Sequence, residues 1–284
     1  QEELDKAREA LEMSVSLDTD SFESHEALSL LYSREKKSDE AIAEINEAIK
    51  LENKEPRLHL TLGKLLLESG KEDDAVEAFK KATNLFPENF SAQIRLADWY
   101  YIKGMLEKSL ETYKVAETLD SDNPVVQARL GKIYADKKQT NKAQVALEKA
   151  IKLNPKDAES HYQLGKLVSA EGKWGRAQSL LSNAIALNAK HGDSYYELGV
   201  VLLGRGNVDL AKDNFEKALD LEPKNSDYIM GLAMVLVEKK ELDNALEMLL
   251  PVSKKETNNS ELFIAICKVY TKKGYFTAAT GYCE

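Results

Sequence analysis

Histidine and cysteine, the side chains best suited to metal binding or nucleophilic chemistry, are few and widely spaced in this sequence. The 284 residues include four histidines and two cysteines. His25, His59 and His161 are separated by multiples of 34 residues, which predicts one repeated helix-packing position. None of them belongs to an H-E-x-x-H pattern or to another metal-ligand spacing. We therefore expect neither a metal site nor a cofactor.

The two cysteines, Cys267 and Cys283, are too few for a disulfide framework or a four-cysteine zinc site. Each falls on a position that packs in the repeat described below. The sequence favours small buried hydrophobic residues at both positions, with a disulfide or a reactive thiol as the alternative.

Acidic residues and glycines are numerous, but their positions indicate structural roles. Asp73 and Asp74 precede an apolar helical pattern, where carboxylates complement the helix dipole and cap free N–H groups. Asp243 is expected to be an N-cap of the same kind. The glycines form neither a G-x-G-x-x-G nor a Walker pattern. No catalytic constellation is found, and we predict that the chain is not an enzyme.

Small residues recur every 34 positions along the chain, without insertions. One series comprises Ala41, Ala75, Ser109, Ala143, Ala177, Ala211, Ala245 and Ala279. A second series lies seven residues later, at Ala48, Ala82, Ala116, Ala150, Ala184 and Ala218. Seven residues are about two helical turns, so both series are predicted on one helix face.

Turn residues divide each 34-residue unit into two helices. Glycines follow the first helix at Gly70, Gly104, Gly172, Gly206 and Gly274, where a positive φ would end it. Pro56 and Pro124 stand where a new first helix begins, a place that tolerates a missing N–H. The sequence therefore predicts antiparallel helix pairs stacked in series.

These positions resemble the tetratricopeptide repeat, whose pattern is clearest in Leu62, Gly63, Gly70, Ala75, Phe79, Ala82 and Pro87. The resemblance implies an all-α fold, a right-handed superhelix of antiparallel helix pairs. We predict a single array over residues 1–284. Its units are a half-repeat at 4–21 and repeats at 22–55, 56–89, 90–123, 124–157, 158–191, 192–225, 226–259 and 260–284.

The charge and hydropathy of the chain limit its partners. Its 48 acidic and 39 basic residues give a formal net charge of -9, which disfavours nucleic acid and anionic membrane surfaces. No segment approaches the roughly 18 apolar residues of a membrane span. We expect a soluble protein without direct membrane insertion, with the cytoplasm slightly favoured and the compartment otherwise unknown.

In the family that the sequence resembles, the first helices line a concave groove that contacts ligands. The corresponding basic residues are Arg57, Lys64, Arg95, Arg129, Lys132 and Lys166. The corresponding apolar residues are Tyr162, Tyr196, Val200, Leu203, Met230, Met234 and Val237. Apolar side chains that the solenoid does not need for packing usually mark a binding surface.

The resemblance and these residues favour a scaffold or adaptor that binds an extended peptide or a partner helix in the groove. The ligand is expected to be acidic with apolar anchors. Two alternatives stay open. In the first, the chain is a regulatory or targeting segment of a larger enzyme, such as a transferase. In the second, it self-assembles into homo-oligomers through uncapped ends.

Pro251 interrupts the second helix of the seventh repeat. An interior proline removes a backbone hydrogen bond and clashes with the preceding turn, so this helix is predicted to kink or to end early. The polar residues that follow predict a weak junction with the last repeat.

Overall fold

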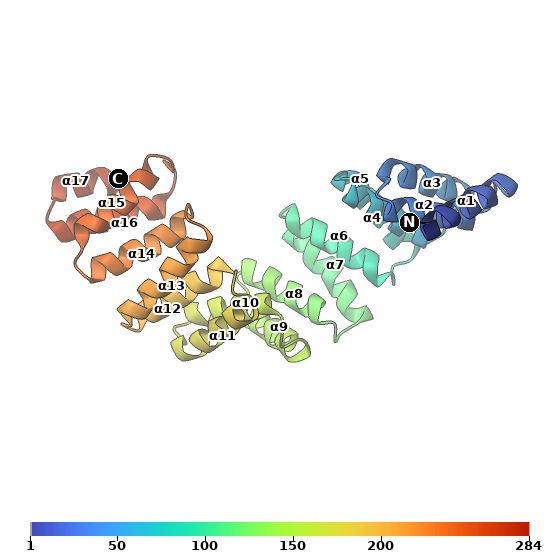
Figure 1. Cartoon of the computed structure of the whole chain (residues 1–284). Coiled ribbons are helices and arrows are strands. Elements are labelled where there is room, and N and C mark those ends of the chain that lie inside the picture. The colour runs from blue at the N-terminus through green and yellow to red at the C-terminus, as the bar shows by residue number, and fades with distance from the viewer. Residues whose placement is uncertain (1, 284) are drawn as a thin grey trace. The chain divides into compact units, whose positions relative to one another are not determined.

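The computed structural model describes residues 2–283, apart from the side chains of residues 2 and 283, and these residues form helices joined by short turns (Figure 1). The first eight are α1 (Glu2–Leu17), α2 (Phe22–Arg34), α3 (Ser38–Leu51), α4 (Pro56–Glu68), α5 (Glu72–Leu85), α6 (Phe90–Ile102), α7 (Leu106–Leu119) and α8 (Pro124–Asp136). The others are α9 (Thr140–Leu153), α10 (Ala158–Ala170), α11 (Trp174–Leu187), α12 (Gly192–Gly204), α13 (Val208–Leu221), α14 (Ser226–Glu238), α15 (Leu242–Ser253), α16 (Ser260–Lys273) and α17 (Phe276–Cys283). The prediction of an all-α repeat fold is confirmed.

The chain divides into two compact units, residues 1–133 and residues 134–284. In each unit the two helices of a repeat pack against each other, as α4 packs on α5 and α12 on α13. In the second unit the first helices of neighbouring repeats also touch, α10 with α12, α12 with α14 and α14 with α16. These helices therefore present one common surface, called the first-helix face below. A single array over the whole chain stays a prediction.

Most of the first helices begin with an N-cap residue whose side chain accepts a backbone hydrogen bond. Ser21, Asn89 and Asp157 each accept a hydrogen bond from the backbone N–H three residues later, which satisfies one of the free donors of that helix end. The second helices from α3 to α15 have no side-chain hydrogen bond at their N-cap. Asp243 is not the N-cap of α15, because Glu241 holds that position and Asp243 lies inside the first turn. That prediction was wrong, although an aspartate in the first turn still complements the helix dipole.

The turn between the two helices of a repeat has a left-handed residue. Gly70, Gly104, Gly172, Gly206 and Gly274 all have φ between 71° and 79°, as predicted. Lys36, Lys138 and Lys240 hold the same place in the remaining repeats and have φ of 61°, 57° and 65°. The sequence did not indicate a left-handed conformation for these lysines, because that prediction relied on glycine. The turn has the same geometry where lysine replaces the glycine.

The core of each repeat pairs a small residue on the first helix with a large one on the second. At Gly165 and Gly199 an added Cβ would lie 2.8 Å from Leu181 Cγ and from Phe215 Cε1. The large residues lie sixteen positions after the small ones and are at most 1% exposed: Ile45, Phe79, Tyr113, Leu147, Leu181, Phe215 and Leu249. Close backbone approach at the small residue makes room for each of them.

The regular spacing of the histidines has a structural reason. His59 and His161 are buried, and Nε2 of each lies 2.9 Å and 3.1 Å from the backbone carbonyl oxygens of Asn53 and Pro155 in the preceding turn. Gln93 donates in the same way to the carbonyl oxygen of Pro87. His59 and His161 therefore pack helices and bind turn carbonyls, whereas His25, also buried as the packing interpretation predicted, has its Nδ1 2.7 Å from Oε2 of Glu44.

Cys267 does not follow its prediction. It is half-buried and forms a disulfide, so the favoured interpretation as a buried free thiol was wrong. The side chain of Cys283 lies outside the described residues. Repeat position alone does not distinguish a packed thiol from a cross-linked one, since both are compatible with a semi-buried helix face.

Pro251 shortens its helix as predicted. The other second helices from α3 to α13 have 14 residues, whereas α15 has 12 and ends at Ser253. The N–H of Lys255 and that of Glu256 both donate to the carbonyl oxygen of Val252, which turns the chain toward α16.

No helix within residues 2–283 is long and apolar enough to cross a membrane. The described residues also contain no group of His, Cys, Asp and Glu side chains that is arranged to hold a metal ion.

Candidate functional site

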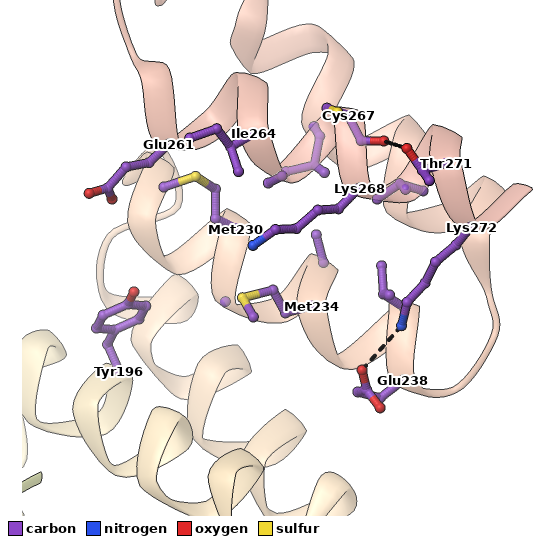
Figure 2. A pocket seen from close by; sticks show the side chains of 16 residues that line it. Tyr196, Met230, Met234, Glu238, Glu261, Ile264, Cys267, Lys268, Thr271 and Lys272 are labelled. Carbon is purple, nitrogen blue, oxygen red and sulfur yellow. Dashed lines mark hydrogen bonds and ion pairs between the residues drawn. The ribbon is translucent and has the colours of Figure 1, made fainter. Parts of the chain in front are cut away.

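The first-helix face of the second unit contains an apolar cavity of about 540 Å³ (Figure 2). Most of its lining comes from α14 and α16, with Leu249 of α15 and with Tyr196 of α12 at one end. Met230, Met234 and Val237 contribute from α14, and Ile264 faces them from α16. Four of the residues predicted for the groove, Tyr196, Met230, Met234 and Val237, thus meet in one cavity. We call it the methionine cavity.

A second cavity of about 380 Å³ adjoins the first on the same face. Val200 and Leu203 of α12 line it together with Trp174 of α11, so two more predicted residues lie there. Tyr196 and Met234 line both cavities. We call this one the tryptophan cavity. The two cavities form adjacent apolar depressions that share a boundary.

Tyr196 is held in place by aromatic neighbours. Its ring stacks on Tyr228 with centroids 5.5 Å apart and meets Phe215 at 5.6 Å in a tilted arrangement. Burial, reinforced by the carboxylates of Asp227 and Glu197, raises the pKa of Tyr196 to about 12. The phenol therefore stays protonated at neutral pH and can donate a hydrogen bond at the boundary of the two cavities.

Gly231 contributes to both cavities by having no side chain. It lines each of them, and a Cβ at this position would lie 2.7 Å from Cδ1 of Phe215. The bare backbone lets the Phe215 ring pack against α14. Any larger residue would have to displace that ring or fill the space beside Met234.

The rim of the methionine cavity has both paired and unpaired charges. Lys272 Nζ lies 3.4 Å from Glu238 Oε1, which links α16 to α14. Lys268 and Glu261 also line the cavity, both are exposed, and within residues 2–283 neither side chain has an ion pair or a hydrogen bond. In Figure 2 the Lys268 side chain extends over the cavity toward Met230 and Met234.

Tyr162 lies apart from the two cavities. Its side chain is 7% exposed and meets the ring of His191 edge-on, with centroids 4.7 Å apart. It belongs to the core between α10 and α12 and does not line either depression. Its position in the repeat predicted that Tyr162 lines the groove, but neighbouring side chains cover it.

Several of the predicted basic residues lie beside an acidic side chain. Arg57 lies 3.1 Å from Glu26, and Arg129 Nε lies 3.2 Å from Asp98. Such pairs on neighbouring repeats reduce the positive charge available to a ligand.

The remaining basic residues differ in their surroundings. Lys166 Nζ lies 3.7 Å from Glu197, and Lys132 Nζ lies 5.5 Å from the ring centroid of Tyr101. Lys64 and Arg95 are exposed, and neither has an ion pair within the described residues. Lys166 lies in the second unit and the other five in the first.

Sequence reasoning missed several lining residues of the eighth repeat. Ile264, Lys268 and Thr271 occupy the same repeat positions as Met230, Met234 and Val237, 34 residues earlier. Extending the same mapping by one repeat would have found them. Trp174 is the first residue of a second helix, a position that holds Leu106, Val208, Leu242 and Phe276 in other repeats, and the family mapping to the first helices did not include it.

These observations define a helical repeat protein with an apolar site on its first helices. Family models of the tetratricopeptide repeat match residues 22–55, 60–124, 162–211 and 202–265, and a model described as a TPR repeat matches residues 131–172. The chain belongs to the tetratricopeptide repeat family. Sequence comparison with curated proteins found no significant match.

Solved structures with the same architecture include three informative cases. YrrB, described as a TPR protein with an unusual peptide-binding site, is 22% identical over 69% of this chain and 97% of its own, with a TM-score of 0.56. MamA is 27% identical over 57% of this chain and 95% of its own, with a TM-score of 0.52. The APC/C hetero-tetramer Cut9–Hcn1 is 17% identical over 94% of this chain and 52% of the matched chain, with a TM-score of 0.69.

Proposed function

We propose that the chain is a protein-interaction scaffold whose second unit binds a peptide or a helix of a partner on its first-helix face. The observation that carries this proposal is the pair of adjoining cavities of about 540 and 380 Å³. Pockets of this size with mainly apolar lining and a few polar groups are typical ligand sites. YrrB, which has this fold, is described as having an unusual peptide-binding site.

The lining suits an adaptable protein ligand. Met230 and Met234 have flexible, polarisable side chains that can adjust to different apolar partners. Met234 is 52% exposed, so its apolar surface is accessible without any rearrangement of α14. Tyr196 adds a rigid aromatic wall with a polar tip, a combination enriched at interfaces.

The first unit contributes a weaker electrostatic contact in this proposal. Lys64 and Arg95 are its exposed, unpaired cations among the predicted basic residues. They would attract acidic stretches of a partner at long range, which affects association more than the lifetime of the complex.

A peptide selection tests the proposed function. Random peptides displayed on phage are selected on the full chain and, in parallel, on a variant with Met234→Glu and Ile264→Glu, which places two charges in the methionine cavity. Both residues are about half exposed, so the variant should fold, as circular dichroism would verify. Enrichment on the parent chain alone supports the proposal. Equal enrichment on both chains, or none on either, contradicts it.

A further inference from the structure

Glu261 and Lys268 place opposite charges at two points along the methionine cavity. Both line it from α16, and they are seven residues apart. Seven residues are about two helical turns, so their backbone positions are separated by about 10 Å along the axis. Neither residue is neutralised by the chain within residues 2–283. Between them, Ile264 adds an apolar side chain to the same lining.

The two charges are not explained by folding alone. Glu261 lies in the first turn of α16, where a carboxylate complements the helix dipole. Lys268 lies in the middle of α16, where the dipole gives it no advantage, and it extends over apolar side chains in Figure 2. Its neighbour Lys272 is paired with Glu238, whereas Lys268 is not. An unpaired ammonium group over an apolar cavity is suited to a carboxylate that arrives with a ligand.

We propose that the methionine cavity recognises a segment of another protein that carries a large apolar side chain between a carboxylate and a cation. The carboxylate pairs with Lys268 and the cation with Glu261, while the apolar side chain enters the cavity between Met230 and Ile264. This inference rests on the proposed function and adds the chemistry and direction of the partner. In an extended segment a separation of about 10 Å corresponds to three residues, and in a helix to seven.

The arrangement fixes the direction in which the segment binds. For a given direction of the ligand backbone, two opposite charges on the rim match only one order of charges along the ligand, because reversal would place like charges together. The apolar contact supplies most of the affinity, and the charges select among ligands. The partner therefore differs from a uniformly acidic peptide, which would place a carboxylate beside Glu261.

A charge exchange tests this proposal. Peptides selected on the parent chain are compared with those selected on the double variant Lys268→Glu with Glu261→Lys. We expect the parent to enrich one order of acidic and basic residues around a large apolar residue, and the double variant to enrich the opposite order. Lys114→Glu, an exposed change on α7 of the first unit and outside both cavities, should leave the order unchanged.

Affinity measurements complete the test. For a selected peptide, fluorescence polarisation should give a Kd about tenfold higher with Lys268→Glu, and a peptide with its carboxylate replaced by a lysine should recover the loss. Enriched peptides without paired charges, or an order unchanged by the exchange, would overturn the proposal but leave peptide binding intact. Enriched peptides that match a stretch of this chain would also overturn it, since the occupant would be a second copy. If no peptide is enriched on the parent chain relative to the Met234→Glu, Ile264→Glu variant, the proposed function is contradicted as well.

Discussion

A Cβ atom on Gly63 would lie 2.7 Å from Cδ1 of Phe79, so the aromatic ring occupies the space that a side chain would need. Both residues are buried, and Phe79 is 1% exposed. Gly63→Ala should therefore push the ring aside and lower the free energy of unfolding by about 1–3 kcal/mol.

Thermal or urea unfolding checks this prediction with Gly175→Ala as its control. Gly175 lies in the first turn of α11, and nothing is within 4 Å of the position of its Cβ. Alanine there should stabilise the chain by about 0.5–1 kcal/mol. Equal effects of the two substitutions would show that the ring of Phe79 does not set the requirement for glycine.

The sequence predicted most of the fold because each repeated position has one dominant physical requirement. Glycine at position 70 supplies a positive φ, and alanine at position 143 permits close approach. The site was predictable only in part. Repeat position indicated Met234, whose side chain is accessible, but it also indicated Tyr162, which neighbouring side chains cover. Whether a residue on the first-helix face is accessible depends on side chains from other repeats, which a single position does not encode.

The left-handed lysines give a prediction about stability. Lys240 has φ of 65°, a conformation that costs a residue with a side chain about 1–2 kcal/mol but costs glycine little. Lys240→Gly should therefore raise the free energy of unfolding by about 1 kcal/mol, after the added entropy of the unfolded chain is subtracted. Lys254, with φ of -69°, is the matched control, and Lys254→Gly should destabilise. A loss of stability at position 240, measured by urea unfolding, would contradict the strain argument.

Pro251 gives a prediction about local opening. Because α15 ends at Ser253, amides of residues 252–259 should exchange with solvent faster than those of α11. Pro251→Ala restores a backbone donor, so the helix should extend and exchange in this segment should slow. Pro223→Ala, two residues after the end of α13, should change nothing there. Hydrogen exchange measured by mass spectrometry tests this prediction. Equal protection of residues 252–259 and α11 in the parent chain would contradict a weak junction.

Glu197 gives a prediction about pH. Burial raises the pKa of this carboxyl group, although Lys166 partly opposes the shift. Because the folded-state pKa exceeds the unfolded one, ionisation disfavours folding, and this cost develops as pH rises through the two pKa values. Glu197→Gln should therefore stabilise the chain at pH 7, and the difference should vanish below about pH 4. Glu247→Gln, at an exposed site on α15, is the control. A difference that persists unchanged in acid would contradict the burial effect.

If the apolar cavities of the second unit bind a partner segment, removing contact surface from them should speed dissociation of that segment. Met234 lines both cavities and is 52% exposed, so Met234→Ala removes contact surface with little effect on folding. Val145 on α9 is 68% exposed, does not line either cavity, and Val145→Ala is its matched control. For a peptide selected on the parent chain, surface plasmon resonance should show dissociation about tenfold faster with Met234→Ala and unchanged with Val145→Ala. Equal dissociation rates for the parent chain and Met234→Ala would show that the peptide does not bind in these cavities.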